Sequence, residues 1–275
     1  MTDEPRARSS SPIRAVVFDV GETIVDESRA WGEWADWLGI PRLTLFAVLG
    51  GVIARGDAHQ GVFDVLRPGL DLAAEAARRR KASGETWVNA KDLYPDALPA
   101  IATLREAGYL VGVAGNQPQE TEQVIASLGI PLDLVASSDG LGVAKPDPAF
   151  FERIADELHL PAGAIAYVGD RIDNDVIPAR QAGMLPIFIR RGPWAWLQSL
   201  DGMPAGTIRI DSLLEVVDVV AGHGRRPGGG AAARLQPADP SPVALAPAAD
   251  QQDQAQDHEQ GRDDEGRDVG DSDLG

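Results

Sequence analysis

The sequence contains no cysteine, and only four histidines and three lysines occur among its 275 residues. Without cysteine the chain forms neither disulfides nor thiolate zinc sites. Carboxylates are abundant instead, with 42 Asp and Glu residues. Their oxygens are the ligands that hard cations such as Mg²⁺ and Ca²⁺ prefer. Any metal chemistry of this protein is therefore expected to use oxygen ligands.

Long apolar runs and a basic surface are also missing. No stretch approaches the roughly 18 apolar residues of a membrane-spanning helix, and the N-terminus is too polar for a secretory signal. The formal net charge of −17 disfavours binding to nucleic acids, whose phosphates attract basic surfaces. We therefore expect a cytoplasmic protein with neither a membrane partner nor a nucleic-acid partner.

The apolar content of 44% is enough for one substantial core and an accessory domain. Residues 1–12 are polar and are expected to form a flexible leader. Residues 222–275 contain eleven acidic and five basic residues and few large apolar side chains, which predicts a disordered acidic tail. The rest of the chain remains acidic, so an anionic substrate would be repelled unless a cation mediates its binding.

Short apolar runs bounded by turn residues alternate with helical patterns. The runs read as buried strands: IRAVVFDV, YLVGVAGN, DLVASS, AIAYVGD, LPIFIR and, more weakly, TIRI. The helical patterns cover 96–107, 119–128, 148–160, 175–182 and 212–221. Strands that alternate with helices predict an α/β fold with a doubly wound parallel sheet.

The interval between the first two predicted strands is too long for simple alternation. Residues 27–94 have helical patterns throughout. We therefore expect a helical cap over 27–94, inserted into a catalytic core that consists of 13–26 and 95–221. The tryptophans of this insert are expected to pack in its core, with the lining of a substrate pocket as the alternative: Trp31, Trp34, Trp37 and Trp87.

Several predicted strands are followed by polar residues that a strand does not require. Asp19 follows the first strand, Asn116 the second and Asp170 the fourth. Ligands of open α/β sheets bind at the carboxyl ends of the strands, where Asp175 and Lys145 also fall. Crowded carboxylates repel one another, and Mg²⁺ relieves this repulsion together with substrate phosphate and water. A nearby lysine can hold a phosphoryl oxygen, so this set of residues indicates phosphoryl transfer.

The segments FDVGET, VAGN, AKPDPAFF and VGDRIDND occur in this order over residues 13–221. Together they resemble the four motifs of the haloacid dehalogenase-like hydrolase superfamily. The resemblance implies a Rossmannoid core with a helical cap inserted after the first motif. It also implies that Asp19 forms an aspartyl-phosphate, while Lys145 steadies the nucleophile and the phosphoryl group. It further implies an Mg²⁺ site with these ligands: Asp19, Asp170, Asp175 and the backbone carbonyl of Gly21.

Two positions depart from the phosphatases of that superfamily. Their second Asp, two residues after the nucleophile, protonates the leaving oxygen and later activates water, but Gly21 stands there in this chain. A placed acid/base typically contributes about 10²- to 10⁴-fold to the rate, so we expect slow turnover or a good leaving group unless Glu22 or Asp26 substitutes. The Ser or Thr of the second motif is replaced by Gly115. Gly115 and Asn116 are therefore expected to bind the phosphoryl group with one hydroxyl donor fewer.

Taken singly, these residues also have simpler explanations. Asp19 and Asn116 are residue types common in turns, and Asp175 suits the N-terminus of a helix. Asp173 is expected to be a solvated loop charge. It is the combination of motifs that makes a catalytic role the better interpretation.

The sequence thus predicts a cytoplasmic, Mg²⁺-dependent hydrolase that acts on a small phosphorylated metabolite through an aspartyl-phosphate on Asp19. One alternative is a metal-independent 2-haloacid dehalogenase, in which Asp19 attacks carbon. Another is a catalytically silent binding protein with the same fold. The intact Gly169-Asp170 pair favours the metal-dependent enzyme, because the resemblance implies that dehalogenases lack this pair.

Overall fold

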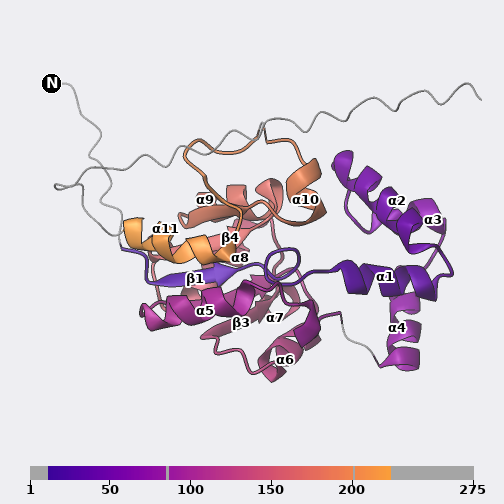
Figure 1. The fold of residues 1–275 in the computed structure, drawn as a ribbon, viewed down its shortest axis with the longest axis horizontal. Coiled ribbons are helices and arrows are strands. Elements are labelled where there is room, and N and C mark those ends of the chain that lie inside the picture. Colours follow the sequence, from indigo (N-terminus) through magenta and orange to yellow (C-terminus); the bar gives the residue numbers. More distant parts are fainter. Residues whose placement is uncertain (1–11, 85–86, 201, 224–275) are drawn as a thin grey trace, which may run out of the picture. The chain divides into compact units, whose positions relative to one another are not determined.

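The computed structural model describes residues 12–84, 87–200 and 202–223, and its central element is a parallel β-sheet (Figure 1). The strands are β1 (Ala15–Phe18), β2 (Leu110–Gly115), β3 (Leu134–Ser137), β4 (Ile165–Gly169), β5 (Leu185–Ile189) and β6 (Ile208–Ile210). Their order in the sheet is β3-β2-β1-β4-β5-β6, and all the pairs are parallel. Each strand lies within an apolar run that predicts it, so the doubly wound α/β fold is confirmed.

The central strand β1 is buried along its whole length, as a strand covered on both faces must be. Its last residue, Phe18, pairs with Val113 of β2 and with Val168 of β4. The chain leaves β1 toward β2 on one side and reaches β4 on the other, so the strand order reverses at β1. The carboxyl ends of these three strands therefore meet at one edge, which is where α/β sheets bind their ligands.

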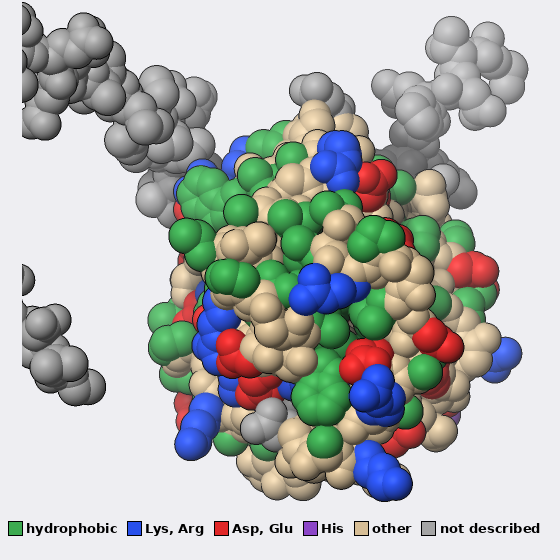
Figure 2. Space-filling view, turned by 90° about the vertical axis from the view of Figure 1, so that its right-hand side faces the viewer, with side chains coloured by type: hydrophobic (Ala, Val, Ile, Leu, Met, Phe, Trp, Pro, Cys, Tyr) green, Lys and Arg blue, Asp and Glu red, His purple; other side chains and the backbone are tan. Residues whose placement is uncertain are grey.

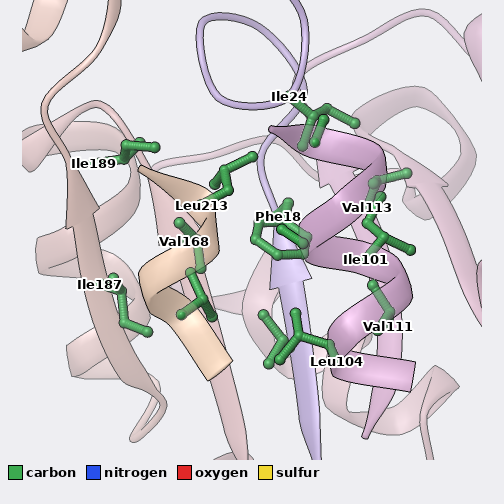
Figure 3. Packing of buried hydrophobic residues seen from close by; sticks show 14 of the residues in the cluster. Phe18, Ile24, Ile101, Leu104, Val111, Val113, Val168, Ile187, Ile189 and Leu213 are labelled. Atoms are coloured by element: carbon green, nitrogen blue, oxygen red, sulfur yellow. The ribbon is translucent and has the colours of Figure 1, made fainter. Parts of the chain in front are cut away.

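Helices cover both faces of the sheet (Figure 1). One face packs against α5 (Ala97–Glu106), α6 (Glu120–Ser127) and α11 (Val216–His223), and the other against α8 (Pro148–Glu157) and α9 (Ile177–Gln181). Figure 3 shows the side chains of Phe18, Val113 and Val168 on the first face, in one cluster with Ile101 and Leu104 of α5. This apolar packing fixes the strands whose ends carry the polar residues.

Several short elements are absent from the sequence prediction. They are α7 (Ser138–Leu141), α10 (Gly192–Leu197) and the 3₁₀ turn η2 (Ala162–Ala164), whereas the 3₁₀ turns η1 (Ala90–Asp92) and η4 (Leu213–Glu215) fall within segments predicted as helical. Elements of three to six residues are too short to show a hydrophobic period. The helix predicted over 175–182 begins earlier than expected, with a π-helical turn, η3 (Ile172–Val176), ahead of α9.

The interval between β1 and α5 is helical. It contains α1 (Ser28–Trp37), α2 (Arg42–Ala54), α3 (Gly61–Leu66) and α4 (Leu72–Ser83). These helices share an apolar cluster that includes Trp31, Trp34 and Phe63, together with Trp194 from α10. We call residues 27–94 the insert. Its boundaries as a separate domain remain a prediction. Residues 1–11 of the predicted leader and 224–275 of the predicted tail lie outside the described residues, whereas Gly222 and His223 of the predicted tail belong to α11.

The outer surface of the insert is mixed in character. Figure 2 shows this side of the molecule, where hydrophobic side chains lie among acidic and basic ones. Among the described residues no single helix is long and apolar enough to cross a membrane. The pair α1 and α2, bent by 117° relative to each other, passes the same criterion when the two helices are counted together.

Candidate active site

Three buried carboxylates lie together at the carboxyl ends of the central strands. Asp19 directly follows β1, Asp170 directly follows β4, and Asp175 belongs to η3. One oxygen from each carboxylate lies within 4.8 Å of the others. The backbone N–H of Asp19 donates to the carbonyl of Val168 at 2.8 Å, so the pairing of β1 with β4 continues into the site. The parallel register thus brings together residues that lie about 150 positions apart in the chain.

Lys145 is the cation of this cluster. Its Nζ lies 2.7 Å from Oδ1 of Asp19 and 2.6 Å from Oδ1 of Asp175, and only 4% of the residue is exposed. Burial opposes the positive charge, but the combined attraction of Asp175 and Asp19 raises the pKa of Lys145 well above its ordinary value. Lys145 therefore carries a fixed positive charge beside the predicted nucleophile.

Asp170 has a carboxylate oxygen without a hydrogen-bond donor. Its Oδ2 is buried and has no hydrogen-bond partner among the described residues. Burial and then the neighbouring charges of Asp175 and Asp19 raise the pKa of Asp170 well above its ordinary value. Three carboxylates facing one lysine leave an excess of negative charge. A buried carboxylate oxygen without a hydrogen-bond donor is also unfavourable, unless another group binds it. Both features fit a divalent cation with oxygen ligands.

Asp175 is already engaged through both oxygens. Oδ1 accepts from Nζ of Lys145, and Oδ2 accepts from the backbone N–H of Arg171 at 3.0 Å. Gln198, which follows α10, clamps the same loop, because it accepts from the N–H of Ile172 at 2.9 Å and donates to the carbonyl of Asp170 at 2.7 Å. No motif in the sequence points to Gln198, since its role depends on how α10 packs.

Asn116 joins the loops after β2 and β3. Its side chain donates to the carbonyl of Lys145 at 2.9 Å and accepts from the N–H of the same residue at 2.8 Å. This pair of bonds positions Lys145. The neighbouring Gly115 lies against Asp19, and a Cβ there would come within 2.7 Å of Oδ1 of Asp19. Both residues thus border the site, and their phosphoryl-binding role remains a prediction.

The space beside Gly21 is filled by a carboxylate from the start of the insert. A Cβ atom at position 21 would collide with Oε1 of Glu27, and the three atoms nearest to it all belong to that side chain. Oε1 of Glu27 accepts from Nε1 of Trp87 at 2.9 Å, while Oε2 accepts from Nε1 of Trp31 at 3.3 Å. Burial, followed by the charge of Glu22, raises the pKa of Glu27 to about 7.

The two acids that the sequence suggests as substitutes at this position have other partners. Glu22, with a positive φ of 51°, accepts from the hydroxyl of Tyr94 at 2.6 Å and from the N–H of Glu27 at 3.0 Å. Asp26 accepts from the N–H of Ser28 at 2.8 Å, close to the start of α1. Glu27 belongs to no motif, and its position depends on the turn that follows β1.

A cavity of about 430 Å³ opens between the insert and the carboxyl end of β2. On the insert side its lining includes the aromatic Trp31, Trp34, Phe63 and Trp87 and the basic Arg79 and Arg80. Glu27 and Asn116 belong to the lining as well, so the cavity extends toward the carboxylate cluster. Trp31 and Trp34 belong to the apolar cluster of the insert, Trp87 packs against it, and all three also line the cavity. Trp37 packs against the same cluster and is not part of the lining.

Comparisons with known proteins agree with this geometry. The haloacid dehalogenase-like hydrolase family model matches residues 13–183. A glyceraldehyde 3-phosphate phosphatase from Methanopyrus kandleri is 31% identical over 76% of this chain and 97% of its own length. A phosphoserine phosphatase from Thermus thermophilus is 29% identical, over 77% of this chain and 82% of its own length.

Solved structures show the same fold. A protein described as a predicted phosphoglycolate phosphatase, from Haemophilus somnus, superposes with a TM-score of 0.60 at 18% identity over 76% of this chain and 98% of its own. A dehalogenase superposes with a TM-score of 0.56 at 23% identity over 75% of this chain and 96% of its own. With the matched motifs in place at the carboxyl ends of the strands, the chain belongs to the haloacid dehalogenase-like hydrolases.

Proposed function

We propose that this enzyme is a cytoplasmic, Mg²⁺-dependent phosphatase that hydrolyses a phosphate monoester of a small metabolite through an aspartyl-phosphate on Asp19. The observation that carries the proposal is the buried cluster of Asp19, Lys145, Asp170 and Asp175 at the carboxyl ends of β1 and β4. The phosphatase names of the relatives from Methanopyrus kandleri and Thermus thermophilus support the same reaction class.

The residues that would hold Mg²⁺ are Asp19, Asp170, the backbone carbonyl of Gly21 and Asp175. Asp170 is the strongest candidate, because none of the residues that the structure describes donates a hydrogen bond to its buried Oδ2. Both oxygens of Asp175 already accept hydrogen bonds, from Lys145 and from the Arg171 amide. Its main contribution to the cation site would therefore be to position Lys145 and the loop that carries Asp170. When bound, the cation would neutralise charge on the phosphoryl oxygens and so let an anionic ester approach an acidic site.

The remaining steps use side chains of the chain itself. A carboxylate oxygen of Asp19 attacks phosphorus, and the bond from phosphorus to the leaving oxygen breaks. The ammonium of Lys145, 2.7 Å from that carboxylate, stabilises charge on the transferring phosphoryl group. Water then attacks phosphorus, which releases phosphate and restores Asp19. The clamp between Asn116 and the Lys145 backbone holds the lysine in place for both steps.

The cavity supports a particular kind of substrate. The leaving part of the ester would enter the cavity between the insert and β2, where aromatic side chains form part of the wall beside Arg79 and Arg80. Aromatic walls favour an apolar or planar group over a strongly charged one. We therefore propose a phosphate ester of a small metabolite with an apolar portion.

The dehalogenase alternative has less support. The solved dehalogenase at 23% identity is evidence of a common fold alone. A metal-independent attack of Asp19 on carbon gives no role to the orphaned oxygen of Asp170, whereas a cation does. A catalytically silent binding protein would keep the cation site but would turn over no ester.

Phosphate release from a panel of phosphate monoesters, with and without EDTA, tests the proposal. We expect release from at least one ester that EDTA abolishes and that Asp19→Asn removes. Chloride release from 2-haloacids in the presence of EDTA would instead support the dehalogenase. Stabilisation by phosphate esters without turnover of any of them would support the silent binding protein.

A further inference from the structure

The proposed phosphatase reaction leaves one chemical requirement open. When the bond from phosphorus to the leaving oxygen breaks, that oxygen needs a proton, and in the second step a water molecule must lose one. The turn after Asp19 offers no side chain for this at position 21, because that residue is glycine. Neither Lys145, which is held by two carboxylates, nor the buried Asp175 is free for the task.

A carboxylate from another part of the chain occupies the vacant position. The carboxyl group of Glu27 lies where the first side-chain atom of residue 21 would be, and it makes the closest approaches to that point. The φ angle of Gly21 is outside the left-handed region, so its backbone conformation does not by itself require glycine. Position 21 has no room for a side chain, because the Glu27 carboxyl group fills the volume where a Cβ atom would lie.

The Glu27 carboxylate is held in a defined orientation. Two indole N–H groups, from Trp87 and Trp31, donate to its two oxygens, and its backbone N–H donates to Glu22. Hydrogen bonds from two rigid rings restrict the rotamers of a long side chain, which is how a reacting group is positioned in advance.

The same carboxylate faces the route that a substrate would use. Glu27 lines the cavity between the insert and β2, together with Asn116, whose neighbour Gly115 lies against Asp19. Consider an ester whose phosphoryl group contacts Asp19 and whose leaving part lies in this cavity. Its leaving oxygen would lie between Asp19 and Glu27. Glu27 therefore stands on the leaving-group side of the nucleophile.

We propose that Glu27 is the catalytic acid/base of this enzyme and supplies from the insert the carboxyl group that Gly21 lacks. In the first step Asp19 forms a bond to phosphorus, the bond to the leaving oxygen breaks, and the Glu27 carboxyl gives its proton to that oxygen. In the second step the Glu27 carboxylate takes a proton from the attacking water, and the bond between phosphorus and Asp19 breaks. Phosphate leaves, and both side chains return to their initial states.

A purely structural role for Glu27 would be to anchor Trp31 and Trp87. The two roles differ in how they depend on the leaving group. Loss of an acid slows an ester whose alkoxide leaves poorly but hardly affects p-nitrophenyl phosphate, whose phenolate leaves without a proton. Loss of an anchor slows both esters alike. The comparison uses kcat/KM, which covers the steps up to release of the leaving group.

The first experiment measures kcat/KM of Glu27→Gln on p-nitrophenyl phosphate and on the alkyl phosphate that the wild type hydrolyses fastest. We expect a loss of about 10²- to 10⁴-fold on the alkyl ester and of less than about tenfold on the aryl ester. Glutamine keeps the size and one acceptor oxygen, and thermal unfolding checks that the variant folds. Equal losses on both esters, or no loss, would overturn the proposal.

Two neighbouring acids provide matched controls. Glu22→Gln alters the carboxylate that Tyr94 holds, and Asp26→Asn alters the one that accepts from Ser28. We expect neither variant to show the selective loss on the alkyl ester. Selective loss in one of them but not in Glu27→Gln would transfer the acid/base role to that residue and contradict the proposal.

A relocation experiment tests the geometry itself. Glu27→Ala removes the carboxyl group and opens the space next to position 21, so Gly21→Asp combined with Glu27→Ala should regain at least about tenfold of the lost activity on the alkyl ester. Gly21→Asp alone should hydrolyse it more slowly than the wild type, because its side chain would collide with Glu27. The proposal is contradicted if Gly21→Asp brings no gain in the Glu27→Ala background.

This inference rests on the proposed phosphatase function, but the two fail in different ways. Absence of phosphate release from every ester by the wild type, or full activity of Asp19→Asn, would overturn the function and the inference together. Activity that depends on Asp19 but not on Glu27 would overturn the inference alone.

Discussion

The carboxylate cluster at the strand ends and the cavity beside the insert differ in how the fold builds them. In the cluster, residues at the ends of the sheet strands are fixed by the parallel register, and charged groups contact each other directly. In the cavity, aromatic side chains from α1, α3 and the segment after α4 line the wall together with the basic Arg79 and Arg80 of α4. We infer that the strand ends perform the phosphoryl chemistry, whereas the insert selects the leaving group and supplies the proton.

The largest expected effect lies in the cluster. Asp19→Asn removes the nucleophile while keeping its size, and we expect the rate of phosphate release to fall on the order of 10⁴-fold or more. The matched control is Asp173→Asn, because Asp173 is exposed, belongs to η3 like Asp175 and forms its ion pair with Arg171. If the rate of phosphate release fell by a similar factor in both variants, the carboxylates of the cluster would be no more important for catalysis than an exposed one, which would contradict the proposal.

Lys145→Met should cause the next largest effect, on stability. Removing a buried cation leaves Asp19 and Asp175 without their shared partner, and breaking a buried ion pair in this way costs about 3–5 kcal/mol. Urea unfolding measures the change, with the exposed Lys91→Met as the control. An unchanged free energy of unfolding would show that the cluster does not depend on its lysine.

Cation binding is the next test of the cluster. Mg²⁺ at about 100 times its Kd should stabilise the folded protein by about 2.7 kcal/mol. Asp170→Asn should remove most of this stabilisation, because Asp170 holds the unpartnered oxygen. Thermal unfolding with and without Mg²⁺ measures both. Stabilisation that persists in the variant would place the cation elsewhere.

The smallest expected effect belongs to the cavity. Phe63→Leu shortens an aromatic wall, and such a change is worth about 1–3 kcal/mol in discrimination between substrates. We expect the ratio of kcat/KM between an aromatic and a small aliphatic phosphate ester to fall, while Mg²⁺ stabilisation stays the same. A uniform loss on both esters would mean that the cavity does not select the substrate.

The cluster could be predicted from the sequence because its signals are local. Asp19 and Asp170 each end an apolar run, and the parallel sheet follows from the alternation of such runs with helices. Lys145 is placed by its motif and by the helix that starts at Pro148.

The contributions of the insert and of α10 could not be predicted in the same way. Glu27 reaches Gly21 only because the chain turns back after β1, through the positive φ of Glu22. Gln198 clamps the Asp170 loop because of how the six-residue α10 packs. Such contacts depend on tertiary packing, which leaves no periodic pattern in the sequence.

Trapping of the covalent intermediate tests the central claim most directly. The enzyme is mixed with p-nitrophenyl phosphate and Mg²⁺, quenched with acid within milliseconds to seconds and analysed by peptide mass spectrometry. We predict one added phosphoryl group, located on Asp19 and missing in Asp19→Asn. Steady release of phosphate with no phosphoryl group on Asp19 at any quench time, or with the group on another residue, would contradict the account.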